Sequence, residues 1–142
     1  MKPIMEFNIK IDRNEITRME TPSGKVTFIP FGGKVESDLF VGTIRPGAAD
    51  VQVTNAAGIR HMCAKYIFEG TDKEGRHCFL FVENNGFFEP NSSPSPFHAC
   101  PTFKSDSPLL ADILERSCFR AEGHPAKDGV TIKIFNVLEK AD

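Results

Sequence analysis

Apolar and polar residues alternate over much of this chain, which is the pattern of half-buried β-strands. The clearest case is the segment 5–11, where Met5, Phe7, Ile9 and Ile11 are separated by polar residues. Further segments with the composition or alternation of strands are 26–31, 39–45, 49–54, 59–69, 77–84 and 130–134. Short strands at this spacing indicate an all-β barrel or sandwich rather than alternating βαβ units.

One segment, 108–117, has the spacing of an amphipathic helix. Ser107 is suited to the N-cap and Pro108 to the first helical position. The residues of its apolar stripe are Leu109, Leu110, Ile113 and Leu114. A helix this short cannot form a layer of its own, so we expect it to close one end of a barrel.

We therefore predict that residues 1–142 form a single all-β domain. Its architecture is expected to be one antiparallel β-barrel of about eight strands, lipocalin- or allene-oxide-cyclase-like in outline, with one short helix. A chain of 142 residues is near the commonest size for one domain. A barrel of eight strands has room for one small ligand, and its loops lie around its mouth.

The two longest apolar segments are expected to pair as a hairpin. Pairing Phe68 with Cys78 and Met62 with Asn84 makes one face almost entirely apolar, whereas a slip of one residue would mix the two faces. In this register Tyr66 and Asn84 are the strongly polar groups on the apolar face. They are therefore candidates for contact with a ligand inside the barrel.

A second pair of polar residues follows the Pro46-Gly47 turn. Asp50 and Gln52 are two residues apart on one predicted strand, so they share a face. If that face is the barrel interior, Asp50 is a candidate base or charge anchor and Gln52 orients the ligand. Alternatively, Asp50 caps the turn and Gln52 faces water.

These two pairs define the predicted ligand-binding site. We expect Asp50, Gln52, Tyr66 and Asn84 to line one pocket, with the proline-rich loop 86–97 near its mouth. Asp50 is the one candidate catalytic residue. The prediction requires that the Asp50 face and the Tyr66 face are the same barrel interior.

The charge pattern bears on the partners. The formal net charge is −2, and the Lys and Arg residues are scattered singly, so we expect no nucleic-acid and no membrane partner. Residues 1–20 contain many charged residues and no apolar run, so neither a signal peptide nor a membrane span is expected there. We therefore expect a cytoplasmic protein with reduced cysteines.

The chain contains three pairs of possible metal ligands, His61-x-Cys63, His98-x-Cys100 and His77-Cys78. Zinc sites do use Cys and His, but the sequence has no Cys-x-x-Cys spacing, and small buried cysteines are common in protein cores. We expect no metal site and no cofactor.

Several motifs together resemble one family. They include 42–52, with its Pro-Gly-x-Ala-Asp-x-Gln core, and the segments 21–24, 29–33 and 64–66. In these motifs the chain resembles the uncharacterised family DUF3237, also called UPF0311. The resemblance implies a small antiparallel β-barrel and brings no established activity.

Three classes of function follow. The first is a protein that binds a small apolar or amphipathic molecule in the barrel lumen. The second is a cofactor-independent cyclase, isomerase or lyase that uses Asp50 in general acid/base catalysis, and the third is an interaction or scaffold protein with a filled barrel. Because 79–82 is apolar on both faces, a homodimer is also expected.

Overall fold

The computed structural model describes residues 2–138, which form eleven β-strands, one 3₁₀ turn and one α-helix. The strands are β1 (Met5–Lys10), β2 (Thr17–Thr21), β3 (Gly24–Pro30), β4 (Gly32–Glu36), β5 (Phe40–Ile44), β6 (Ala49–Thr54), β7 (Arg60–Asp72), β8 (His77–Phe88), β9 (Phe97–Ser105), β10 (Phe119–Ala126) and β11 (Gly129–Asn136). The helix α1 is Pro108–Leu114, and the 3₁₀ turn η1 is Arg13–Glu15.

Eight of these strands close an antiparallel barrel, which confirms the predicted fold class. Around the barrel the order is β7, β5, β4, β1, β11, β10, β9 and β8, and β8 pairs back with β7. All of these pairings are antiparallel.

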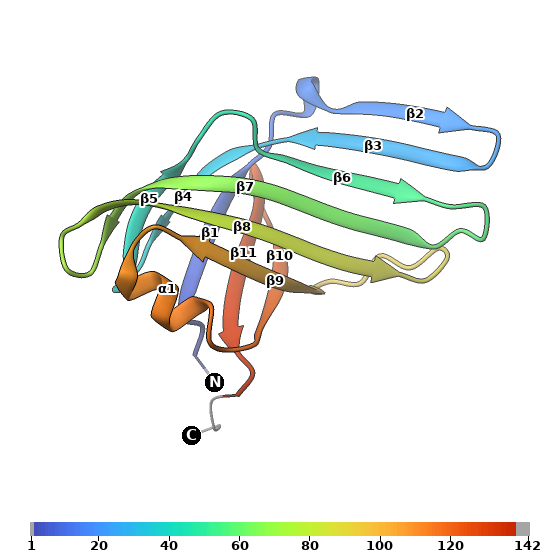
Figure 1. The fold of residues 1–142 in the computed structure, drawn as a ribbon. Helices are drawn as coiled ribbons and strands as arrows, with labels where there is room; N and C mark the ends of the chain where they lie inside the picture. The colour runs from blue at the N-terminus through green and yellow to red at the C-terminus, as the bar shows by residue number, and fades with distance from the viewer. Residues whose placement is uncertain (1, 139–142) are drawn as a thin grey trace.

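The other three strands, β2, β3 and β6, extend the sheet beyond the barrel, and we call them the arm. The first half of β7 pairs with β6 and the second half pairs with β5. Two bends separate the arm from the barrel: Phe31 lies between β3 and β4, and the Pro46-Gly47 turn lies between β5 and β6. Figure 1 shows the arm at the upper right, continuing the curved layer of β7 and β8.

The helix α1 lies at one end of the barrel (Figure 1). Large buried side chains fill the barrel interior at this end. The rings of Phe7 and Phe68 pack 4.8 Å apart, and Phe40 packs edge-on against Phe68. Leu110 and Leu114 bury the inner face of the helix. The predicted helix is therefore present and lies at a barrel end, although it ends before the expected residue 117.

No helix among residues 2–138 is long and apolar enough to cross a lipid bilayer.

Four strands were not predicted as such, namely β2, β4, β9 and β10. β9 contains Pro101, and β10 contains Gly123 and Pro125, residues that are depleted in strands. β2 has no buried residue and so shows no apolar alternation. β8 extends to Phe88 and β9 begins at Phe97, so the predicted loop 86–97 is shorter than expected.

The predicted register of the β7–β8 hairpin was wrong by two residues. Cys78 pairs with Gly70 rather than with Phe68, and Asn84 pairs with Ala64. The turn is shorter than expected because Asp72 Oδ1 accepts the backbone N–H groups of both Glu74 (2.9 Å) and Arg76 (3.0 Å). A two-residue shift leaves every side chain on its predicted face, because the side-chain period of a strand is two.

Candidate functional site

A cavity of about 230 Å³ opens at the end of the barrel where the arm begins. Its walls are mainly apolar side chains from the arm, β1, β7, β8, β9 and β11. Its polar lining residues are Asp50, Gln52, Arg60, Tyr66, Asn84 and Ser93. The cavity is therefore an apolar chamber with a few polar groups, which is the usual composition of a small-molecule site.

The structure brings the predicted site residues Asp50, Gln52, Tyr66 and Asn84 to this one cavity. The strand register explains how: Asp50 on β6 pairs with Ala64 on β7, which pairs with Asn84 on β8. Asp50 and Tyr66 thus lie on the same side of the sheet. In the alternative, Asp50 caps the turn and Gln52 faces water; in the structure both residues line the cavity and are bonded to each other.

A chain of hydrogen bonds links Asp50 to the rim of the cavity. Asp50 Oδ2 accepts Gln52 Nε2 at 2.8 Å, and Gln52 Oε1 accepts Arg60 Nη1 at 3.4 Å. Arg60 Nη2 donates to the Ser92 carbonyl oxygen at 3.3 Å, and its guanidinium lies 4.6 Å from the Phe88 ring centroid. The Gln52 amide therefore relays between a cation and an anion, which fixes its orientation.

The relay residue Arg60 was not among the predicted site residues. It stands at an even-numbered position of β7, as do Met62, Ala64 and Tyr66, so strand alternation places it on the same face. The even-numbered spacing from Arg60 to Tyr66 is therefore the feature of the sequence that could have identified Arg60 as a site residue. Its pairing with Thr54 on β6 also places it directly beside the arm.

Two buried oxygens in the cavity lining lack a hydrogen-bond partner among residues 2–138: Asp50 Oδ1 and Asn84 Oδ1. Asn84 is only 3% exposed, so bulk water does not reach its amide freely. A third buried side-chain atom without a hydrogen-bond partner among residues 2–138 is Arg120 Nε, and Arg120 does not line the cavity. Unpaired buried acceptors are rare in folded proteins, so two in one small cavity call for an explanation.

Burial controls the ionisation of the two titratable groups at the cavity floor. It raises the pKa of Asp50, while the hydrogen bond from Gln52 and the nearby charges of Arg60 and His61 lower it in part. Burial also raises the pKa of Tyr66, and the neighbouring Asp50 carboxyl adds to this effect. Tyr66 therefore stays protonated at neutral pH and keeps its O–H donor.

The comparisons with known proteins can now be set beside this geometry. The family model described as "Protein of unknown function (DUF3237)" matches residues 1–137. The chain belongs to the DUF3237 family. No curated protein matches the sequence.

Solved structures share the DUF3237 fold seen here. A conserved protein of unknown function from Rhodopseudomonas palustris is 23% identical, with a TM-score of 0.72 over 94% of this chain and 93% of its own. A protein of unknown function from Clostridium acetobutylicum is 22% identical, with a TM-score of 0.74 over 95% and 96%. A β-barrel-like protein from Acinetobacter baumannii is 16% identical, with a TM-score of 0.74 over 95% and 93%. These likenesses establish the barrel and leave the role of the cavity to be argued from its residues.

The cysteine and histidine pairs of this DUF3237 chain do not converge on one point. The His61 ring stacks on Phe87 at 4.5 Å and bonds to Asn85 Oδ1 at 3.0 Å. The thiols of Cys63 and Cys100 are free. Within residues 2–138 no group of three or more His, Cys, Asp or Glu side chains is arranged to hold a metal ion.

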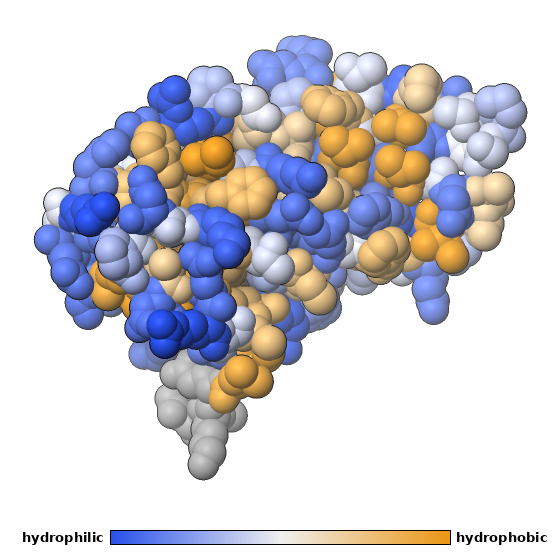
Figure 2. Space-filling view, in the orientation of Figure 1, coloured by the Kyte–Doolittle hydropathy of each residue, from blue (hydrophilic) through white to orange (hydrophobic). Residues whose placement is uncertain are grey.

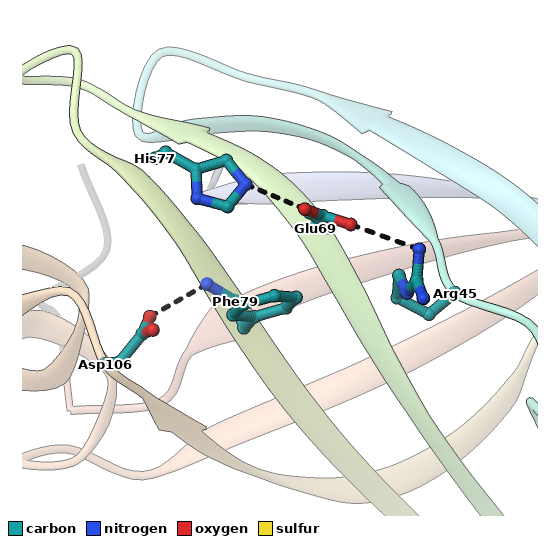
Figure 3. A network of polar contacts seen from close by, with 5 residues as sticks. All are labelled: Arg45, Glu69, His77, Phe79 and Asp106. Atoms are coloured by element: carbon teal, nitrogen blue, oxygen red, sulfur yellow. Dashed lines mark hydrogen bonds and ion pairs between the residues drawn. The ribbon is translucent and has the colours of Figure 1, made fainter.

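Another polar network lies outside the cavity, on the surface of the barrel (Figure 3). Glu69 contacts His77 at 2.8 Å and Arg45 at 3.3 Å, and Asp106 accepts the backbone N–H of Phe79 at 2.8 Å. The side chains of His77 and Arg45 are more than half exposed. Such surface ion pairs contribute about 0–1 kcal/mol, so this network is a surface feature rather than a second site.

Proposed function

We propose that this DUF3237 protein binds one small, largely apolar molecule in the cavity at the arm end of its barrel. The volume of about 230 Å³ supports a ligand the size of a single ring with a short substituent. By comparison, an engineered apolar cavity of about 150 Å³ in another protein binds benzene. A filled-barrel scaffold protein would not need such a chamber.

The observation that carries this proposal is the pair of buried oxygens without partners, Asp50 Oδ1 and Asn84 Oδ1. Leaving a buried polar group unpaired costs about 1–3 kcal/mol, and more when the group is charged. A bound molecule that supplies the missing partners would offset this cost. The arrangement is thus typical of a site prepared for a ligand.

Filling the cavity tests the proposal. Ala64 is small and lines the cavity between Asp50 and Asn84, so Ala64→Leu should occupy the space of the ligand. The matched control is Thr102→Leu, which adds a side chain of the same kind at an exposed position of β9. Binding is measured by ligand-observed NMR with benzyl alcohol, and native mass spectrometry of freshly purified protein looks for a retained molecule. The wild type and Thr102→Leu should bind benzyl alcohol and Ala64→Leu should not; equal binding by all three would contradict the proposal.

A second candidate function is cofactor-independent acid/base catalysis by Asp50, of the cyclase, isomerase or lyase type. The raised pKa of a carboxyl that faces an apolar cavity favours it. It ranks below simple binding because the side chain hydrogen-bonded to Asp50 is Gln52, which does not transfer protons. If a molecule is retained, a change of its NMR spectrum over time with the wild type but not with Asp50→Asn would favour catalysis, since cyclisation and isomerisation leave the mass unchanged. The cytoplasmic location expected from the sequence stays a prediction, which cell fractionation tests.

A further inference from the structure

We infer that the molecule bound in the cavity carries a hydrogen-bond donor, a hydroxyl or an amine, that is held between Asp50 and Asn84. This inference rests on the proposed function and names the chemical class of its ligand. The two oxygens that lack partners belong to residues of strands on either side of β7. Both are acceptors. An amine carries enough N–H groups to donate to both oxygens, whereas a hydroxyl donates its single hydrogen to one of them.

The spacing of the two residues suits a single small group. Adjacent strands lie about 4.8 Å apart, so the backbones of β6 and β8 at this level are separated by about 10 Å across β7. The residue of β7 between them is Ala64, whose methyl group leaves the space above it open. A hydroxyl or amine placed there is within reach of side chains extending from both sides.

The hydrogen-bond relay indicates a donor rather than an acceptor. Asp50 Oδ2 is already bonded to Gln52 Nε2, and an ionised carboxylate only accepts, so Asp50 Oδ1 needs a donor. The nearby cation, Arg60, donates to Gln52 Oε1 and to the Ser92 carbonyl oxygen. A carboxylate held between Asp50 and Asn84 would therefore face two acceptors, and one of them is charged.

The remainder of the ligand faces a mainly apolar wall. Ile29 and Phe31 of the arm side, Phe97 of β9 and Ile132 of β11 line the same cavity as the polar pair. Together with the volume of about 230 Å³, these walls favour a ring-sized alcohol, phenol or amine.

Four probes that share one ring and differ in one group test the inference: toluene, benzyl alcohol, benzylamine and benzoate. Their dissociation constants are measured by ligand-observed NMR for the wild type, Asp50→Asn and Glu83→Gln. Glu83 lies on the outer face of β8 and bonds Asn85, so Glu83→Gln controls for the loss of one carboxylate outside the cavity. We expect benzyl alcohol and benzylamine to bind the wild type at least about tenfold more tightly than toluene, and benzoate to bind most weakly.

Asp50→Asn should reduce the advantage of benzylamine over toluene about tenfold or more, because the charge-assisted hydrogen bond is lost. Glu83→Gln should leave it unchanged. If toluene binds as well as the two donors, or if benzoate binds best, the inference is wrong while the proposed function stands. If none of the four probes binds the wild type, both are overturned. A preference for benzylamine over benzyl alcohol identifies an amine as the donor, and the reverse preference identifies a hydroxyl.

Discussion

Replacing Asn84 with leucine should make the protein more stable, which is unusual for a polar-to-apolar change in a strand interior. Asn84 is 3% exposed, and its Oδ1 has no hydrogen-bond partner in the described chain. Leucine has nearly the same shape as asparagine, and Asn84→Leu therefore removes the unpaired acceptor without leaving a void. The change exchanges an unfavourable buried group for an apolar side chain that faces an apolar cavity.

The magnitude follows from the penalty that is removed. An unsatisfied buried polar group costs about 1–3 kcal/mol, so Asn84→Leu should raise the free energy of unfolding by about that amount. For a chain of this length the melting temperature should rise by roughly 3–10 °C. The same change removes one of the two acceptors proposed for the ligand, so binding of benzyl alcohol should weaken as stability rises.

Urea unfolding and thermal melting, both followed by circular dichroism, measure this effect in the absence of added ligand. The control is Asn85→Leu, one residue further along β8 on the outer face. Both ends of the Asn85 amide are hydrogen-bonded, since its Nδ2 donates to Glu83 Oε2 at 2.9 Å and its Oδ1 bonds His61 at 3.0 Å. Asn85→Leu should therefore be neutral or destabilising by up to about 1 kcal/mol. A loss of stability in Asn84→Leu as large as in the control would refute the reasoning, because it would mean that the Asn84 amide is already satisfied.

Three further predictions follow from the structure. The hydrogen bonds from the Ser107 hydroxyl, the N-cap of α1, and from two backbone N–H groups lower the pKa of Asp72. The ionised Asp72 therefore stabilises the fold above its unfolded pKa near 3.9, and this stabilisation is lost as the pH falls through its folded pKa. In Asp72→Asn, the free energy of unfolding should fall less steeply as the pH is lowered. Burial raises the pKa of Asp50, so its effect has the opposite sign: stability falls as the pH rises through the folded value, and urea unfolding of Asp50→Asn at neutral pH should show a more stable protein. β2 is the edge strand of the sheet, and two copies of β2 paired antiparallel about Met19 would place Arg18 opposite Glu20 of the other copy. Sedimentation should therefore show a dimer that Arg18→Glu dissociates and that the double variant with Glu20→Arg restores. A wild-type monomer at micromolar concentration would contradict the expected homodimer.

The exposed apolar surface of the arm is consistent with self-association. Met19 and Phe28 are 53% and 44% exposed, and Val53 of β6 is 43% exposed. Strand pairing places all three on the outer face of the arm, which Figure 2 shows as a hydrophobic region at the upper right. Joining two arms through β2 would make this region continuous across the dimer.

The strands that could be predicted are those whose own residues are typical of strands. β1 alternates strictly between buried and exposed residues, and its pattern is visible in the sequence. β2 is exposed on both faces and so has no apolar alternation to detect. β10 does alternate between buried and partly exposed residues, but Gly123 and Pro125 are residue types that are depleted in strands. Their place in the sheet is set by pairing with neighbours, which the local sequence does not encode.

The candidate site was predictable as a set of residues but not as a geometry. Alternation put Asp50 with Gln52 and Tyr66 with Asn84, since each pair is separated by an even number of positions within its own strand or hairpin. Whether the two pairs share one interior depends on the pairing of β6 with the first half of β7. The chain enters β6 through the Pro46-Gly47 turn. Gly47 has a φ of 102°, which glycine adopts readily, and the turn redirects the chain from the barrel into the arm.

The cavity itself follows from the order of side-chain sizes along two neighbouring strands. From the helix end to the arm end, the inward residues of β7 are Phe68, Tyr66, Ala64 and Met62, and those of β8 are Leu80, Val82, Asn84 and Gly86. Large rings fill the barrel around Phe68, the Tyr66 ring forms the cavity floor, and small or polar residues leave space beyond it. The unpaired oxygens lie where the packing of apolar side chains ends. Their cost to the free energy of folding therefore arises at the level of the barrel where the proposed ligand would supply the missing hydrogen bonds.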